Sequence, residues 1–359
     1  MSTLKIASRS PVRFDPAGGG TDAPPYCHEH GGLVVNCAIA RYAYAHFQWL
    51  PPGSGVHLHS LDFGQRTWAP NPESLRKDEN LALVKIHVAK LMAGRNDFLL
   101  VTHSDVPLHT GLGGSGAMSV AMTGTLLKAV GGEVDIAELP VLANKIERGD
   151  MGTAGGSQDH YGSALGGAKE ITYHKGGGSQ VRILNIPPAF LAQLERDVLL
   201  VYTGGVHLSS NIHTDIKRSY AMENSPTVAA MHGLRAAAKI MSAALEAGQI
   251  EGFIQALNSS RQNHYALHES CDNEVLRRYF KELAPHILAG KTCGAGGGGF
   301  IVVLTRPGHK SACMKAAEAM GGIVWPWKMD TEGLKIWQES PWTGAELEAL
   351  LVPPGDRRS

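Results

Sequence analysis

The sequence predicts a mixed fold of helices and strands divided between two domains, on three observations. The chain has 359 residues, more than one hydrophobic core usually serves, so two domains with a cleft between them are expected. Segments with the pattern of strands alternate with segments of helical period, which predicts an α+β or α/β fold. The 43 glycines are bunched rather than spread, and glycine clusters mark places where backbone takes a positive φ or approaches a ligand closely.

Runs of apolar or alternating residues predict strands, and apolar residues at helical spacing predict helices. The elements expected in the first half are a strand at 5–12, a glycine loop at 17–22, a strand at 32–40, an aromatic-rich β segment at 41–50, a helix at 80–93, a strand at 98–102, a helix at 115–130 and a helical run at 136–147. A second glycine-rich stretch, 152–156, leads into the segment that carries Asp159.

The second half is expected to be richer in helices. Ser225-Pro226 combines a capping residue with proline in the first turn, which is typical of a helix start. The elements expected are a strand near 198–203, helices at 227–247, 249–268 and 273–284, a strand at 300–304, a helical run at 310–320 and a strand near 323–327. No internal repeat is detected.

The composition argues against several classes of function. Lys plus Arg and Asp plus Glu both number 33, without a run of like charges, so nucleic acid and anionic membranes are poor candidate partners. The N-terminus lacks the pattern of a signal peptide and no apolar stretch approaches bilayer length, which predicts a cytoplasmic location. The five scattered cysteines favour reduced thiols, and Cys27-His28-Glu29-His30 lacks a second cluster at zinc spacing.

The glycine loop at 107–117, Pro-Leu-His-Thr-Gly-Leu-Gly-Gly-Ser-Gly-Ala, leads directly into a predicted helix. Such a loop points several backbone N–H groups and the positive end of the helix at one place, which suits nucleotide phosphates. Gly111, Gly113 and Gly116 also fit the dinucleotide pattern G-x-G-x-x-G, with Asp135 near the expected ribose-binding position. A long proline-containing connection separates the loop from the preceding strand, which disfavours that reading, and no P-loop pattern occurs.

Two more segments carry glycine motifs, 10–22 (Ser-Pro-Val-Arg-Phe-Asp-Pro-Ala-Gly-Gly-Gly-Thr-Asp) and 291–300 (Lys-Thr-Cys-Gly-Ala-Gly-Gly-Gly-Gly-Phe). Together with 107–117 they resemble, in order and spacing, the three motifs of the GHMP kinase superfamily. The phosphate-loop pattern of that family is Pro-x-x-x-Gly-Leu-Gly-Ser-Ser-Ala. This chain departs from it at Gly114, in place of the first Ser, and at Gly116, in place of the Ala.

The resemblance implies a two-domain GHMP kinase fold with the active site in the cleft. Residues 1–195 would form an N-terminal domain of the ribosomal protein S5 domain 2 type, and 196–359 a ferredoxin-like C-terminal domain. The implied cofactors are ATP and Mg²⁺. The third motif would be a loop of the C-terminal domain that packs against the phosphate loop and the nucleotide.

The resemblance also implies roles for individual residues. Asp159 matches the catalytic aspartate and Arg13 the catalytic-site arginine, while Ser115 and Glu147 match the magnesium-coordinating side chains. Taken alone, an aspartate in a glycine-rich loop is usually a cap or turn residue. The implied nucleotide-binding residues are Pro107, Gly111, Leu112, Gly113, Gly114, Ser115, Gly116, Ala117, Gly296 and Gly297, and the implied sugar-binding residues are Gly18, Gly19, Gly20, Thr21, Asp22 and Gly156.

Within the superfamily, Ala-Gly-Gly-Gly-Thr-Asp at 17–22 looks more like the heptose-phosphate and fucose kinases than the galactokinases. The segments 155–161 and 331–337 point the same way. The implied acceptor is the anomeric hydroxyl of D-glycero-D-manno-heptose 7-phosphate, with L-fucose or a related sugar as the alternative. The matches to the catalytic residues argue against a non-catalytic sugar sensor, and a homodimer is left open.

A heptose 7-phosphate needs hydrogen-bond donors at the end of the sugar away from the reacting hydroxyl. Arg9 precedes Arg13 by four residues, and equal parity in an extended strand puts both side chains on one face. Arg9 is therefore a candidate for the distal phosphate. Pro11 lies between them and could break the parity, in which case Arg9 faces solvent.

Overall fold

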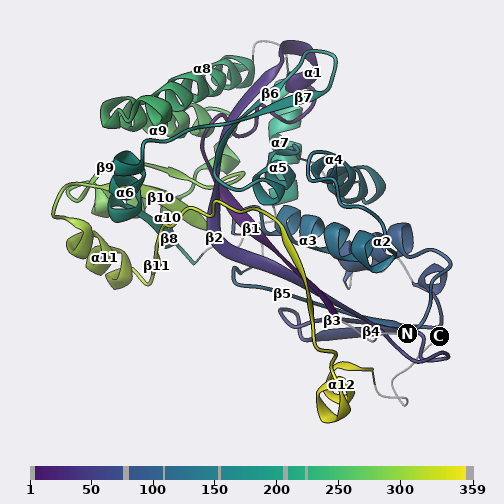
Figure 1. Cartoon of the computed structure of the whole chain (residues 1–359). Coiled ribbons are helices and arrows are strands. Elements are labelled where there is room, and N and C mark those ends of the chain that lie inside the picture. Colours follow the sequence, from purple (N-terminus) through teal and green to yellow (C-terminus); the bar gives the residue numbers. More distant parts are fainter. Residues whose placement is uncertain are drawn as a thin grey trace.

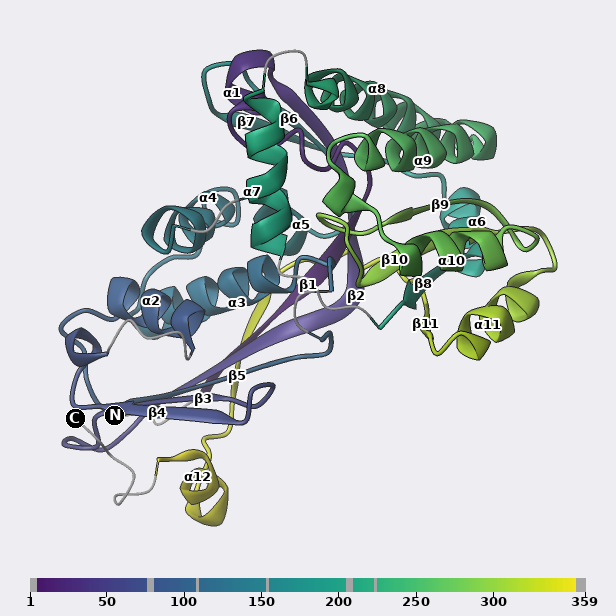
Figure 2. The ribbon, with the colours of Figure 1, turned by 180° about the vertical axis from the view of Figure 1, so that it is seen from behind.

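The computed structural model describes residues 5–75, 81–107, 110–152, 155–204, 209–222 and 225–352. These residues form an eight-stranded sheet and a four-stranded sheet, with helices packed against both (Figure 1, Figure 2). The α+β class predicted from the sequence is confirmed.

The large sheet is built around two long strands, β1 (Lys5–Ala17) and β2 (Gly32–Trp49), which pair antiparallel. The strand order is β12-β1-β2-β5-β3-β4, and β6 and β7 extend from the first half of β2. The other strands are β3 (Val56–Ser60), β4 (Gln65–Ala69), β5 (Phe98–Ser104), β6 (Ala168–Tyr173), β7 (Ser179–Ile183) and β12 (Lys335–Glu339).

Helix α3 (Gly114–Ala129) is the central helix on this sheet. Its residues from Gly116 to Leu126 are all buried, and most are small, so the helix can lie close to the strands. The Ser8 hydroxyl of β1 donates a hydrogen bond of 3.0 Å to the Ala121 carbonyl of the helix. The neighbouring helices are α2 (Ala82–Leu91), α4 (Leu139–Asn144), which continues as a π-helical segment (Lys145–Asp150), and α5 (Gln158–Ala164). This arrangement holds the start of α3 beside α5.

The small sheet has the strand order β11-β8-β10-β9, with every pair antiparallel. Alternate residues of its central strands face opposite sides, as a strand period of two requires. Leu199, Val201 and Ile301 pack in a cluster with α10 and α11, whereas Leu200 and Val302 join the main core. The elements are β8 (Val198–Tyr202), β9 (Ile287–Thr292), β10 (Phe300–Thr305), β11 (Ile323–Pro326), α10 (Glu274–Leu283) and α11 (Lys310–Ala319).

The antiparallel helix pair α8 and α9 lies across both sheets (Figure 1, Figure 2). The Ser225 side chain caps α8, accepting a hydrogen bond from the Thr227 N–H, and Pro226 occupies the first turn, as predicted. The remaining helices are α1 (Tyr26–His30), α6 (Pro188–Asp197), α7 (Ser209–Tyr220), α8 (Pro226–Ala247), α9 (Ile250–Tyr265), α12 (Gly344–Leu350) and two 3₁₀ turns at Pro72–Ser74 and Glu269–Cys271.

The structure adds elements that the sequence analysis did not predict. These are the strands β3, β4, β6, β7, β9 and β12 and the helices α1, α5, α6, α7 and α12. Strand β12 is hydrogen-bonded to β1 in the large sheet, although its residues fall in the predicted C-terminal range 196–359. The domain boundary near 195 stays a prediction.

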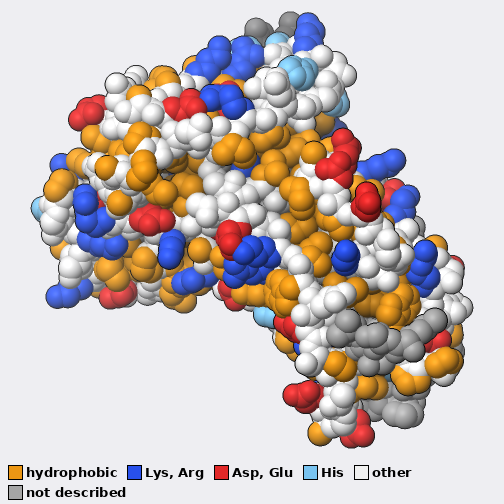
Figure 3. Space-filling model, viewed as in Figure 1, with side chains coloured by type: hydrophobic (Ala, Val, Ile, Leu, Met, Phe, Trp, Pro, Cys, Tyr) orange, Lys and Arg blue, Asp and Glu red, His pale blue; other side chains and the backbone are white. Residues whose placement is uncertain are grey.

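No helix in the described part of the chain is long and apolar enough to cross a membrane. On the face drawn in Figure 3, acidic and basic side chains are interspersed rather than gathered by sign.

A buried ion pair joins the two sheets. The Lys291 ammonium group of β9 donates hydrogen bonds to the Asp15 carboxylate (2.8 Å) and to the Asp15 backbone carbonyl (2.7 Å) of β1. The two side chains are 3% and 2% exposed. Although burial disfavours the charged form, Lys291 and Arg13 keep the pKa of Asp15 below its usual value. The edge-to-face contact of Phe14 and Trp327 (5.7 Å between ring centroids) lies in the same shared core.

We expect Lys291→Met to destabilise the protein by about 3–5 kcal/mol, because it leaves a buried carboxylate without its partner. Lys335→Met, which removes an exposed partner of Glu332, should cost less than about 1 kcal/mol. Urea unfolding of both variants measures the difference. Equal losses in the two variants would show that the buried pair does not hold the sheets together.

Candidate active site

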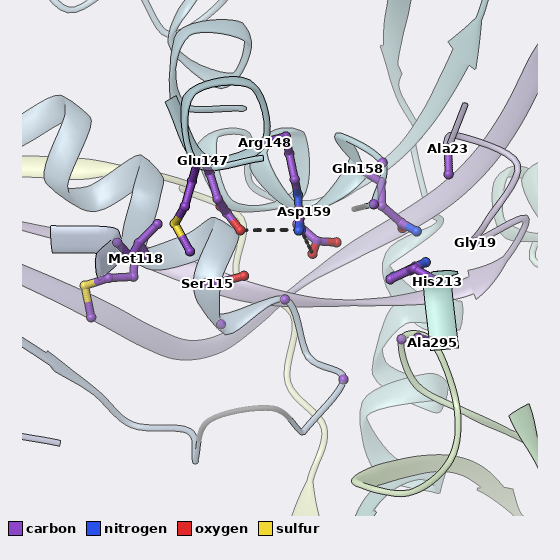
Figure 4. Close-up of a pocket in the computed structure, with 18 of the residues that line it drawn as sticks. Gly19, Ala23, Ser115, Met118, Glu147, Arg148, Gln158, Asp159, His213 and Ala295 are labelled. Atoms are coloured by element: carbon purple, nitrogen blue, oxygen red, sulfur yellow. Dashed lines mark ion pairs between the residues drawn. The ribbon is translucent and has the colours of Figure 1, made fainter. Parts of the chain in front are cut away.

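A cavity of about 750 Å³ brings the three glycine motifs together. Its lining includes Gly19 and Gly20 of the first motif, Gly113 of the second and Gly294 of the third. Parts of α2, α5 and α7 complete its walls. Figure 4 shows Asp159 in the middle of this region, with Ser115 and Glu147 on one side and His213 on the other.

Arg13 and Asp159 form the central ion pair of the cavity. The Arg13 Nε donates to Asp159 Oδ1 at 2.7 Å, a second guanidinium nitrogen contacts the same oxygen, and the third donates to the Gly111 carbonyl at 2.7 Å. Burial acts against the charged guanidinium, but Asp159 and Asp15 outweigh it and raise the pKa of Arg13. Arg13 therefore connects the strand, the phosphate loop and the carboxylate.

Asp159 lies in the first turn of α5, not in a loop as the sequence suggested. A Cβ atom at Gly162, one turn further along α5, would lie 2.9 Å from Arg13 Cγ. The glycine therefore leaves room for the arginine side chain to pass the helix and reach Asp159. The Arg148 guanidinium lies 3.7 Å from the other carboxylate oxygen of Asp159, Oδ2. It also lies 3.4 Å from the Glu147 carboxylate.

Ser115 and Glu147, the predicted magnesium-coordinating residues, lie together at the cavity wall. The Ser115 side chain is hydrogen-bonded to the Glu147 carboxylate, and His160 Nε2 lies 2.8 Å from Glu147 Oε2. Burial raises the pKa of Glu147, but His160, Arg148 and Ser115 lower it more, to about 2. The carboxylate is thus ionised at neutral pH.

A hydroxyl and an ionised carboxylate are hard oxygen ligands of the kind Mg²⁺ prefers. No group of three or more His, Cys, Asp or Glu side chains suited to a metal ion occurs in the described residues. The pair therefore fits a cation that is also bound by water and substrate phosphate oxygens, which is usual for Mg²⁺ at phosphoryl-transfer sites.

The start of α3 has the features of an anion-binding site, as the sequence analysis expected for nucleotide phosphates. Gly113 precedes the helix with φ 71°, and no side chain caps it. The first N–H groups of a helix have no partner within it, so those of Gly114 and its neighbours are available to an anion beside the positive end of the helix dipole.

The third motif packs against this phosphate loop, as predicted. A Cβ atom at Gly294 would lie 2.7 Å from Gly111 Cα, and one at Gly299 would lie 2.4 Å from the Thr110 carbonyl oxygen. The Phe300 N–H also donates to that carbonyl at 2.9 Å. Close contact of backbone with backbone thus requires glycine in this loop.

Asp22, one of the predicted sugar-binding residues, is buried beside α5. It accepts hydrogen bonds of 3.1 Å from the Gly20 N–H and the Gln158 N–H. A Cβ atom at Gly156 would lie 1.8 Å from the Asp22 carboxylate, so only glycine fits there. Burial, reinforced by the charge of Asp159, raises the pKa of Asp22 to about 6.

Arg9 does not line the cavity, and the prediction that it shares a face with Arg13 is wrong. The register of β1 against β2 shifts between Pro11 and Val12, which breaks the parity. Arg9 instead pairs with Glu332 at 2.7 Å and lies over the Tyr42 ring, 4.4 Å from its centroid.

The other predicted ligand contacts stay predictions, although the structure shows their positions. Gly18 and Thr21 pack against the backbone of Leu33, and Gly296 packs against Cys271. The predicted residues found along the cavity are Arg13, Gly19, Gly20, Asp22, Gly111, Gly113, Gly114, Ser115, Glu147, Gly156 and Asp159, and those outside its lining are Arg9, Pro107, Leu112, Gly116, Ala117, Gly18, Thr21, Gly296 and Gly297.

Several polar residues of the site were missed by the sequence analysis. Arg148 and His160 are sequence neighbours of predicted residues, and Asp15 has the same strand parity as Arg13, so local signals for these existed. Lys291 begins the third motif, but its contact with Asp15 is made only by tertiary packing. His213 lies outside the three motifs, and no local pattern marked it.

Comparison with known proteins extends the local likeness to the whole chain. A family model, GHMP kinases N terminal domain, matches residues 81–167. A Campylobacter jejuni protein named D-glycero-alpha-D-manno-heptose 7-phosphate kinase is 29% identical over 338 residues, covering 93% of this chain and 99% of that protein. The bifunctional fucokinase/GDP-fucose pyrophosphorylase of Arabidopsis thaliana is 26% identical over 84% of this chain, which spans 30% of that protein.

The predicted two-domain fold is confirmed by solved structures. A D-glycero-D-manno-heptose 1-phosphate kinase from Bacteroides thetaiotaomicron superposes with a TM-score of 0.77 at 24% identity, over 93% of this chain and 99% of that one. The galactokinase of Lactococcus lactis, complexed with galactose, gives 0.72 at 18% identity, over 92% and 95%.

The departure at Gly116 predicts a functional constraint. An added Cβ would lie 2.6 Å from Asp159 Cβ and 3.2 Å from its backbone carbonyl carbon, so Gly116→Ala should push the first turn of α5 away from Arg13. We expect kcat to fall by about 10- to 100-fold, because small displacements of reacting groups are costly. Steady-state kinetics on phosphoryl transfer provides the measurement.

The matched control for this variant is Gly149→Ala, whose added Cβ makes only an ordinary contact of 3.8 Å. It should keep a rate near that of the wild type. A Gly116→Ala enzyme with undiminished kcat would mean that the contact with Asp159 does not position the carboxylate.

Because Asp22 is buried, we expect the stability of the folded protein to depend on pH. Its pKa of about 6 exceeds the ordinary 3.8, so the folded protein binds this proton more tightly, and ionisation above pH 6 costs about 3 kcal/mol of stability. Asp22→Asn should therefore raise the unfolding temperature at pH 7.5, and its advantage over the wild type should shrink as the pH falls to 5.

The exposed Asp135, whose carboxylate accepts a hydrogen bond from the Ala137 N–H, provides the control. Asp135→Asn should shift the unfolding temperature equally at both pH values. An advantage of Asp22→Asn that does not change between pH 5 and 7.5 would contradict the raised pKa of Asp22.

Proposed function

The chain belongs to the GHMP kinase superfamily, and from this membership we propose that it transfers the γ-phosphoryl group of ATP to the anomeric hydroxyl of D-glycero-D-manno-heptose 7-phosphate. The product would be the 1,7-bisphosphate, a precursor for nucleotide-activated heptose. The observation that carries the kinase assignment is the Arg13–Asp159 pair, which faces the same cavity as the glycine loop at the start of α3.

Asp159 would accept the proton of the attacking sugar hydroxyl. Arg13 and Arg148 approach its carboxylate from two sides, which would hold the carboxylate in position for a general base. The same two cations line the cavity, so they would also stabilise negative charge that develops as the phosphoryl group moves.

The N–H groups at the start of α3 would hold the ATP phosphates. Ser115 and Glu147 would hold Mg²⁺, which neutralises phosphate charge and fixes the orientation of the transferring group. His160 keeps the Glu147 carboxylate in place through the hydrogen bond of 2.8 Å. The third motif packs against Gly111 and would help to keep the phosphate loop in place.

The choice of acceptor rests on the relatives. The likeness to the heptose 7-phosphate kinase of Campylobacter jejuni extends over nearly the full length of both chains. The fucokinase likeness covers 84% of this chain and only 30% of a bifunctional protein. L-fucose or a related sugar remains the alternative acceptor.

The proposed function is tested by measuring ADP release with a panel of sugars. D-glycero-D-manno-heptose 7-phosphate should give a kcat/KM well above those of the free heptose, L-fucose and galactose. Asp159→Asn should lower kcat by about two to four orders of magnitude, since a positioned base contributes about that much, while ATP affinity changes little. A higher kcat/KM for L-fucose would assign the chain to the alternative, and undiminished turnover of the variant would remove Asp159 from the mechanism.

Glu147→Gln should raise the magnesium concentration that gives half-maximal rate, because a neutral amide is a poorer ligand for a hard dication. The exposed Glu133 offers a control, and Glu133→Gln should leave the magnesium dependence as in the wild type. Magnesium titrations of the initial rate compare the two. If Glu147→Gln has the dependence of the wild type, Glu147 has a structural role only.

A further inference from the structure

Helix α7 forms the wall of the cavity on the acceptor side. The side chains that line the cavity are His213, Ile216, Lys217 and Tyr220, at spacings of three and four residues that put them on one face of a helix. Ile216 also packs in the core cluster of α8, and the Tyr220 hydroxyl donates a hydrogen bond to Glu29 of α1. Both contacts fix which face of α7 is turned inward.

The position of His213 relates α7 to the reacting centre. The charges of Arg148, Asp159 and Arg13 all act on its imidazole, and burial is the main cause that lowers its pKa to about 4. His213 is therefore uncharged at neutral pH and lies at the reacting end of the helix. Figure 4 shows it on the opposite side of Asp159 from Ser115 and Glu147.

Lys217 is one helical turn further along the same face. Helix α7 runs from His213, near Arg13 and Asp159, to Tyr220, which contacts α1, away from the start of α3 (Figure 2). Four residues correspond to about 6 Å along the helix axis, so Lys217 lies beyond His213 in the direction of α1. The two arginines of the lining, Arg13 and Arg148, are paired with carboxylates. Among the described residues, Lys217 is the exposed cation of this lining for which no ion pair is found.

We propose that Lys217 of α7 binds the phosphate group at the far end of the acceptor sugar and so selects a phosphorylated sugar over a free one. This inference rests on the proposed function. A sugar whose anomeric hydroxyl faces Asp159 would extend its far end, with the phosphate, away from the reacting centre, and the exposed ammonium group of Lys217 would supply three donors and a positive charge there. Lys217 of α7, and not Arg9 of β1, would thus bind the distal phosphate.

The test compares two acceptors, D-glycero-D-manno-heptose 7-phosphate and the free heptose, in the wild type and in Lys217→Ala. A charge-assisted hydrogen bond predicts that the variant loses about 10- to 100-fold in kcat/KM for the phosphorylated sugar. The loss should fall mainly on the KM for that sugar. The KM for ATP and the kcat/KM for the free heptose should stay close to the wild-type values.

The matched control is Arg218→Ala, the next residue along α7. Arg218 is exposed, approaches Asp215 at 3.9 Å and is absent from the cavity lining. It should keep the wild-type ratio of kcat/KM for the two acceptors. Thermal unfolding of both variants checks that α7 remains folded.

The possible results separate the two proposals. A wild type that prefers the phosphorylated sugar, together with a Lys217→Ala variant that keeps the full preference, overturns the role of Lys217 and leaves the proposed function standing. Equal losses for both acceptors in Lys217→Ala also overturn it, because they indicate a general effect on the helix. A wild type without any preference for the phosphorylated sugar overturns both proposals.

Discussion

The site depends on a series of alternating charges that runs from the carboxylate of Asp159 through β1 into the second sheet. Asp159 pairs with Arg13, Arg13 interacts with Asp15, and Asp15 pairs with Lys291. Arg13 and Asp15 are two residues apart on β1, so strand parity places both on the same side. Each buried charge has an opposite neighbour, which offsets the cost of removing it from water. The position of Asp159 is therefore coupled to the docking of β9 on β1.

The second constraint is the limited space around the site residues. It explains why glycine is required at positions that the sequence pattern only identified. At Gly116 and Gly162 an added Cβ would meet Asp159 and Arg13, and at Gly156 it would meet Asp22. None of these three needs a positive φ, so the requirement comes from side chains packed against the glycine. By contrast, Gly113 combines its positive φ of 71° with close contact to Arg13.

The sequence predicted the helices and strands that are specified by their own residues. It missed the elements that form only through contacts with distant parts of the chain. The long helix α8 carries its own cap and apolar stripe, so it was predicted nearly to its ends. Strand β12 lies far from β1 in sequence and is specified by pairing with it. Many site residues within the motifs were predicted, but Asp15 and Lys291, which also lie within motifs, were missed because their ion pair exists only after folding. His213 comes from α7, which no motif marked. Arg9 was predicted wrongly because the register of β1 against β2 shifts between Pro11 and Val12, so the parity of a regular strand does not hold from Arg9 to Arg13.

The distribution of charge in the cavity indicates that the nucleotide phosphates and the acceptor phosphate would be bound in different ways. At the reacting end, Arg13 and Arg148 are balanced by Asp159 and Glu147, so little net positive charge remains for a nucleotide polyphosphate. Binding there would depend on backbone N–H groups, the helix dipole and a divalent cation, all of which concentrate at the start of α3. Further along α7, Lys217 is exposed in the lining and has no ion pair among the described residues. A dianion on the acceptor would thus meet a cation that is not paired with Asp159, so the acceptor phosphate and the proposed base would be held by different residues.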